Sequence, residues 1–181
     1  LCSLHILRAL SSAQKDAGDE PRVLSVEDDG EAIGPWPDGS PEFLNALHYA
    51  ATRAAKTGGG VEVLAIITPQ DQTHWLGVAE KMREEARETI EENFKIYSNW
   101  MKEELKLEAE LVIREGEKAT EVLNQISEDK EVGVLVLGAN NSSEGPGPLV
   151  SQLVSRDGGN LPIPVTIVPG SMTKERIEAV S

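Results

Sequence analysis

The sequence predicts a single α/β domain built on an open, mostly parallel sheet of five strands, with helices on both faces. Short β-branched runs alternate with helical segments between Gly39 and Gly170, and strands joined through helices form right-handed parallel crossovers. The length of 181 residues suits one well-packed core and is too short for two ordinary domains. These observations together predict the fold class.

The first strand is expected at Arg22–Val26 (RVLSV), where it is followed by three consecutive acids that include Asp28. Residues 30–37 contain two prolines and a tryptophan and make the connection to the next helix longer than a usual strand-to-helix loop. Residues 1–20 carry no convincing pattern and are interpreted as an N-terminal extension. The first strand is therefore the least well defined of the five.

The start of the first helix is predicted at Ser40-Pro41-Glu42. This triplet combines a hydroxyl N-cap, a proline at the first turn and an acid near the positive end of the helix dipole. Apolar residues then recur at helical spacing from Phe43 to Ala54, and the glycines that begin at Gly58 end the helix. The β-branched run Val61–Ile67 (VEVLAII) is typical of a buried strand.

A long helix is expected from about His74 to Leu107, because an apolar stripe runs along it while Glu, Lys and Arg fill its other faces. A short strand at Leu111–Ile113 leads through Gly116 into a helix that reaches about Ile126. The most apolar segment of the chain, Val132–Leu137 (VGVLVL), is predicted to be a central strand.

The last part of the domain begins with a loop over residues 138–147 and a helix that Pro148 opens and that runs to about Ser155. Pro164–Val168 is the last predicted strand. The domain is accordingly expected to span residues 22–170, and residues 171–181 form a polar tail that is mobile or loosely helical.

Charge excludes some classes of partner. The chain has 17 basic and 31 acidic residues and a formal net charge of −14, so its surface repels phosphate backbones and the anionic face of membranes. We therefore expect neither nucleic acid nor a membrane as a partner. A small phosphate-bearing ligand remains compatible with this charge, because backbone amides bind phosphate locally.

The single cysteine, Cys2, excludes an intrachain disulfide and favours a cytoplasmic location. No apolar run approaches the roughly 20 residues that a membrane-spanning helix needs. Arg8 interrupts the apolar stretch Leu4–Leu10 and no basic leader precedes it, so we do not expect a secretory signal.

Several segments in order resemble one known family. Asp38-Gly39-Ser40-Pro41-Glu42 and the alanine-rich helix after it, the Arg114-Glu115-Gly116 turn, the run Val134–Gly138 and the segment Pro162–Val168 are similar to the universal stress protein family. The resemblance covers roughly residues 38–170. It implies the adenine nucleotide alpha hydrolase-like fold, with a five-stranded parallel sheet in the order 3-2-1-4-5. Ligands of such sheets bind where the strand order reverses, here between the first and fourth strands.

The resemblance also implies site residues for an adenine nucleotide such as ATP. The acid that holds adenosine corresponds to Asp38, or to Asp28 if residues 30–37 are an insertion. The strand-two position that lines the base pocket falls near Ile66, and the first glycine of the phosphate loop corresponds to Gly138. The turn glycine Gly116 also belongs to the candidate set.

The phosphate loop departs from the family pattern. Counting from Gly138, the second glycine position holds Asn141, and the final Gly-Ser/Thr pair falls on Ser151-Gln152. A shifted reading uses Gly145 and Gly147, which stand directly before a helix start. Pro146 and Pro148 lack amide donors, which argues against phosphate binding. Both alternatives stay open: a nucleotide site, or a plain connecting turn.

Two functions follow. The first is a regulatory protein of the stress response that binds an adenine nucleotide, and the second is a dimeric interaction or scaffold protein of the same fold that binds none. The three histidines are scattered and more typical of packing than of metal ligation, and no residue set for hydrolysis is recognisable, so an enzyme is not favoured. The expected partner is a second copy, joined through the edge strand Pro164–Val168, as often occurs in this family. The identity of any signalling partner stays open.

Overall fold

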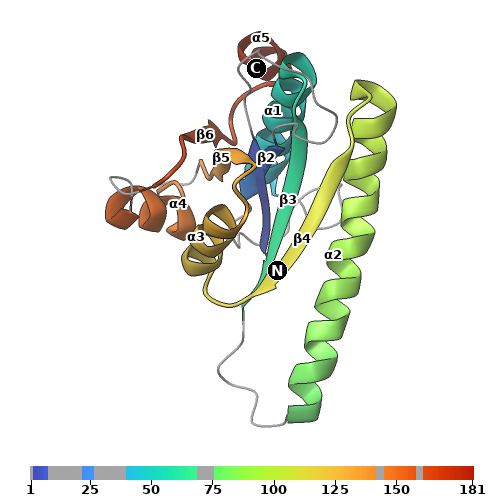
Figure 1. Cartoon of the computed structure of the whole chain (residues 1–181), viewed down its shortest axis with the longest axis vertical. Helices are drawn as coiled ribbons and strands as arrows, with labels where there is room; N and C mark the ends of the chain where they lie inside the picture. Colours follow the sequence, from blue (N-terminus) through green and yellow to red (C-terminus); the bar gives the residue numbers. More distant parts are fainter. Residues whose placement is uncertain (1, 8–21, 27–39, 69–75, 142–144, 158–160) are drawn as a thin grey trace.

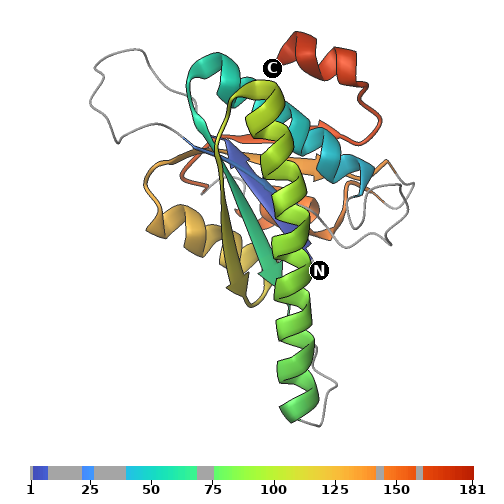
Figure 2. The same ribbon diagram turned by 90° about the vertical axis from the view of Figure 1, so that its right-hand side faces the viewer.

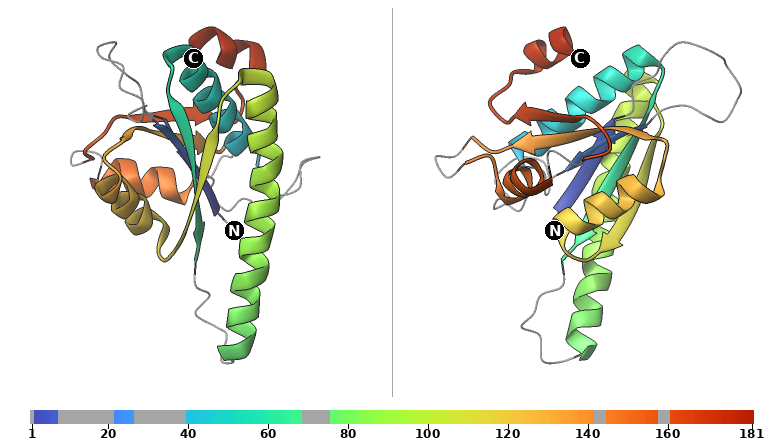
Figure 3. Two further views of the ribbon diagram at one scale, coloured as in Figure 1. Left: turned by 45° about the vertical axis from the view of Figure 1, so that its right-hand side comes forward. Right: turned by 60° about the vertical axis from the view of Figure 1, so that its left-hand side comes forward.

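The computed structural model describes residues 2–7, 22–26, 40–68, 76–141, 145–157 and 161–181. A single twisted sheet forms the centre of the molecule, with helices on both of its faces (Figure 1). Helices α1 (Pro41–Thr57) and α2 (Leu76–Leu105) cover one face, while α3 (Lys118–Glu128) and α4 (Pro148–Gln152) cover the other (Figure 3). The predicted α/β class is confirmed.

Helix α1 begins and ends where the sequence predicts. The Ser40 hydroxyl accepts a hydrogen bond from the Phe43 N–H at 3.3 Å, and Pro41 occupies the first turn. At the other end Gly58 adopts a φ of +73°, a left-handed conformation that disfavours residues with a Cβ, and its N–H donates to the Ala54 carbonyl. Local capping chemistry therefore fixes both ends of the helix.

The sheet has six strands in the order β4-β3-β1-β2-β5-β6. Parallel pairing joins β3 to β4, β2 to β5, and β5 to β6. The five predicted strands thus keep their predicted relative order, and β2 lies beside β5. The strand bounds are β1 Cys2–Leu7, β2 Arg22–Val26, β3 Gly60–Ile67, β4 Ala109–Glu115, β5 Val132–Ala139 and β6 Val165–Pro169.

The expectation of five parallel strands is wrong in one respect, because β1 is a sixth strand that runs antiparallel between β3 and β2. It pairs with β3 along its whole length, from Cys2↔Ile66 to Leu7↔Val61, and it also pairs with β5. An extended segment of either direction satisfies the backbone groups along a strand edge. Parallel pairing is consequently split into two blocks, β3–β4 and β2–β5–β6.

The C-terminal third of the chain contains one further difference from expectation. The helix that starts at Pro148 changes after Gln152 into a π-helical turn, η1 (Leu153–Asp157). The polar tail forms a short helix, α5 (Lys174–Val180), which lies next to α1 (Figure 1). Thr173 caps this helix by accepting from the Arg176 N–H at 3.3 Å. Within the described ranges, no helix is both long and apolar enough to cross a membrane.

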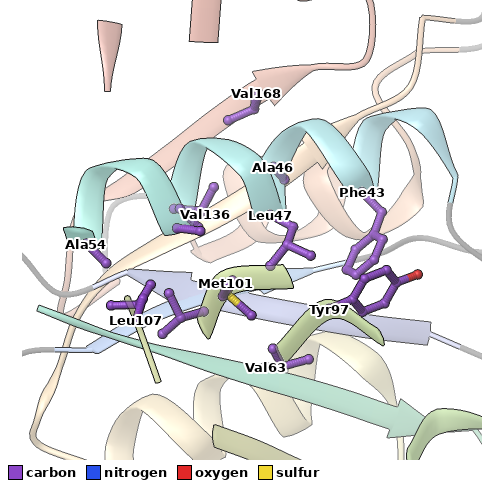
Figure 4. Close-up of a cluster of buried hydrophobic side chains, with 13 residues drawn as sticks. Phe43, Ala46, Leu47, Ala54, Val63, Tyr97, Met101, Leu107, Val136 and Val168 are labelled. Carbon is purple, nitrogen blue, oxygen red and sulfur yellow. The ribbon is translucent and has the colours of Figure 1, made fainter. Parts of the chain in front are cut away.

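Two large apolar clusters hold the layers together. Between the sheet and α1/α2, the Phe43 and Tyr97 rings meet edge to face at 5.5 Å, and Met101 packs beside Val63 (Figure 4). On the opposite face, Leu64 and Ile66 pack against α3 and α4. The first part of α2 extends past the ends of β3 and β4 (Figure 2), and its Met82 side chain is exposed.

Candidate functional site

The candidate site lies where β2 and β5 end side by side. These strands are parallel neighbours through the pair Val26↔Leu137, so the chain leaves both of them at the same edge of the sheet. Beyond Leu137 the residues Gly138 and Ala139 continue β5 and pair with β6. Open α/β sheets bind ligands at such a place, outside the carboxyl ends of two strands whose connections diverge.

The N-terminus of α1 lies directly against the end of β5. A Cβ placed on Gly138 would stand 2.5 Å from the Glu42 carbonyl oxygen and 3.1 Å from the Phe43 nitrogen, so this position requires glycine for a close backbone approach. A Cβ on Gly170 would lie 3.1 Å from the Glu42 Cβ and 3.0 Å from the Asn141 Nδ2. The ends of β5 and β6, the first turn of α1 and the Asn141 side chain therefore converge.

The loop after β5 folds back on itself before α4 starts. The Asn140 N–H donates to the Pro146 carbonyl at 3.2 Å, and the Ser151 N–H donates to the Gly147 carbonyl at 3.0 Å. Gly145 and Gly147 have φ values of +112° and +103°, and Gly147 is the N-cap residue of α4. Ser151 is exposed on α4. The loop thus presents two glycines and a serine beside the end of β5.

Ile66 and Gly116 lie elsewhere in the sheet. Ile66 is fully buried in the cluster that packs against α3 and α4, and β1 separates its strand from β2. Gly116 follows β4, and its N–H donates to the Ile67 carbonyl at 3.1 Å. The two predicted acids, Asp28 and Asp38, fall outside the described residues. The structure therefore brings together Gly138, Asn141, Gly145, Gly147 and Ser151, but sets Ile66 and Gly116 apart from them.

Sequence reasoning missed the part that Glu42 plays in this site. Glu42 is only 7% exposed and lies in the first turn of α1, with its backbone against Gly138 and its Cβ beside Gly170. Reading Glu42 as a favourable charge at a helix start was sound, but the close approach to β5 depends on contacts between residues distant in sequence. The close backbone contact between Glu42 and Gly138 leaves no room for a phosphate between them.

A second carboxylate organises the neighbouring α3 terminus. The Glu117 carboxylate accepts from the Ala119 and Thr120 N–H groups at 3.3 and 2.8 Å, and from the Thr120 hydroxyl at 2.6 Å. These hydrogen bonds lower the pKa of Glu117 below its usual range, and the bond from the Thr120 hydroxyl has the largest effect. Across the described part of the chain, no three His, Cys, Asp or Glu side chains gather as a metal site would require.

These features define a class: an α/β protein in which adjacent parallel strands end side by side with a glycine-containing loop beside their carboxyl ends. Residues 37–169 match the family model described as the universal stress protein family. The chain belongs to the universal stress protein family, as its resemblance had indicated, and accordingly has the adenine nucleotide alpha hydrolase-like fold.

A solved structure supports the same fold. The chain is similar to the universal stress protein UspA from Lactobacillus plantarum with a TM-score of 0.59 and 13% sequence identity, covering 72% of this chain and 92% of that one. A comparison with curated proteins found no match. At this identity the likeness concerns the fold, and a stress-response role follows from family membership.

Proposed function

We propose that this protein is a regulator of the stress response that binds an adenine nucleotide such as ATP in the crevice between β2 and β5. The observation that carries the proposal is the convergence of the β5–α4 loop with the first turn of α1, at the carboxyl end of β5 and beside β2. Membership of the universal stress protein family supports it. Regulation would act through the surface that the bound nucleotide alters.

Packing decides which half of the crevice the phosphates would occupy. The Glu42 backbone closes against Gly138, where an added Cβ would stand 2.5 Å from the Glu42 carbonyl oxygen, whereas Ser151 is exposed on α4. The phosphates are therefore expected on the α4 side, near the exposed Ser151 hydroxyl. Pro146 and Pro148 contribute no N–H, so serine and glycine positions would supply the donors.

Equilibrium dialysis with radiolabelled ATP, ADP and AMP tests this proposal. Ser151→Ala should weaken ATP binding roughly threefold to tenfold, the effect of losing one hydrogen bond, and should weaken AMP binding less because fewer phosphates reach α4. Ser127→Ala, an exposed serine at the end of α3, is the matched control and should bind like the parent. No retention of any of the three nucleotides at millimolar concentration would exclude nucleotide binding.

A second candidate is a dimeric interaction protein that binds no nucleotide. Two observations favour it. Ile66, the expected base-pocket residue, is fully buried and separated from β2 by β1, and Asn141 replaces a glycine of the phosphate pattern. The dialysis experiment distinguishes the two candidates, because only the first predicts retained nucleotide.

Both candidates include a homodimer through β6, near the predicted segment Pro164–Val168. Among the described strands β6 pairs only with β5, so one edge of β6 is open to another strand. Ile167 on this strand is 42% exposed. Pairing with a second copy across a two-fold axis would cover this edge and the Ile167 side chain.

A further inference from the structure

A cavity of about 280 Å³ lies between α1, α2 and α5, on the sheet face opposite α4. Five of its lining side chains are apolar or aromatic, and three are polar. None of them belongs to the candidate nucleotide site. The lining residues are Leu44, Asn45, Leu47, His48, Ile96, Tyr97, Trp100 and Lys174.

The floor of the cavity is buried and its rim is exposed. Leu47 and Tyr97 are 2% and 7% exposed and belong to the buried cluster of Figure 4, whereas Ile96 at the rim is 40% exposed. The Trp100 ring meets the His48 ring edge to face at 5.5 Å. A flat apolar group entering here would be enclosed by aromatic and branched side chains, which favour aromatic ligands.

The side-chain amide of Asn45 positions α5 and is occupied by hydrogen bonds to the backbone. Its Nδ2 donates to the carbonyls of Pro169, Gly170 and Met172 at 3.3, 3.0 and 2.8 Å. This side chain holds the segment between β6 and α5 against α1. It thereby places Lys174, the first residue of α5, at the mouth of the cavity.

Lys174 supplies a positive charge at the mouth of the cavity. The Lys174 side chain is 67% exposed and its ammonium group lies 4.0 Å from the Glu178 carboxylate. Such an exposed pair contributes little and exchanges easily. His48 lies 3.6 Å from the same Glu178 carboxylate. Burial first, and then the charge of Lys174, lower the pKa of His48, while the Glu178 carboxylate raises it.

We propose that this cavity binds a small aromatic carboxylate, with the ring between Leu44, Ile96 and Trp100 and the carboxylate on Lys174. The volume suits a one- or two-ring compound, because drug-sized ligands occupy pockets that begin at about 300 Å³. The His48 imidazole lines the same cavity and is a second side chain that can form hydrogen bonds. The site is separate from the nucleotide crevice, so binding there does not depend on the function proposed above.

Calorimetric titration of the full chain with naphthalene-2-carboxylate and with its neutral analogue naphthalene-2-carboxamide tests the proposal. The carboxylate should bind roughly tenfold more tightly, as expected for a hydrogen bond to a charged group. Lys174→Met should remove this difference while leaving the carboxamide affinity unchanged. The matched control Lys130→Met, an exposed lysine after α3, should behave like the parent.

Leu44→Trp fills the cavity and should abolish binding of both probes, with circular dichroism and a urea midpoint confirming that the variant is folded. Binding of neither probe to the parent, or equal binding of the two, would overturn the proposal. So would a folded Leu44→Trp protein that still binds the carboxylate. ATP should not compete with the probe, and competition would place the probe in the crevice instead.

Discussion

Gly138→Ala tests the close approach between α1 and β5 on which the candidate site depends. The added Cβ would stand 2.5 Å from the Glu42 carbonyl oxygen and 2.6 Å from its carbonyl carbon, well inside the 3.4 Å at which ordinary contact begins. Both atoms belong to the backbone of a capped helix with a buried face, so a side-chain rotation cannot relieve the overlap. The first turn of α1 has to move away from the sheet.

The expected cost is about 3 kcal/mol, at the upper end for overpacking a well-packed interior. Urea unfolding followed by circular dichroism measures it. With a slope of roughly 1–3 kcal/mol/M for a domain of this kind, the midpoint should fall by about 1–3 M while the slope stays unchanged. A changed slope would indicate loss of two-state unfolding instead of a simple loss of stability.

Gly58→Ala is the matched control. Gly58 has a φ of +73° but no atom within 4 Å of an added Cβ, so the substitution costs only the left-handed conformation, roughly 1–2 kcal/mol. The difference between the two variants isolates the close approach. If Gly138→Ala were no more destabilised than Gly58→Ala, α1 would not lie against β5 as described.

Three further predictions concern other parts of the molecule. Gln125→Leu removes the 2.9 Å hydrogen bond to Glu62, a carboxylate that is 1% exposed, and should cost about 1–3 kcal/mol in urea unfolding; Ser127→Ala is the control, and an unchanged midpoint would contradict the reasoning. The pKa of His48 is lowered from its usual 6.5 by burial and Lys174, against the opposing effect of Glu178, so the unfolded chain binds the proton more readily and stability should decrease as pH falls below about 6.5. His48→Gln should flatten the dependence of stability on pH between pH 7 and 5. If the stability curves of the parent and of His48→Gln ran parallel over this range, His48 would not be the group responsible. Ile167→Lys places a charge on the open edge of β6 and should convert a dimer into a monomer in sedimentation at micromolar concentration, whereas a parent that is already monomeric would refute the dimer.

Local sequence signals were sufficient for much of the fold. The Ser40-Pro41-Glu42 triplet located the start of α1, Gly58 located its end, and the β-branched runs located β3 and β5 within two residues. Each of these depends on capping chemistry or on burial within a few neighbouring residues. The order of the strands came from the family resemblance.

What sequence reasoning missed depends on contacts between distant segments. The short run Cys2–Leu7 carries no clear period, and its pairing depends on the edge that β3 offers. The proximity of Glu42 to Gly138 and Gly170, and the cavity beside His48, arise only when α1, β5, β6 and α5 come together. Reading His48 and Trp100 as packing residues is compatible with their ring contact, but the periodicity of two separate helices does not reveal the space between them.

The most direct test of nucleotide binding in the crevice is the adenine content of the protein as purified. Acid denaturation of the parent chain should release adenine absorbance approaching one equivalent per chain, and Ser151→Ala should release less. An absence of adenine in the parent, together with no uptake of added ATP, would show that the β5–α4 loop is a connecting turn and that the protein acts without a nucleotide.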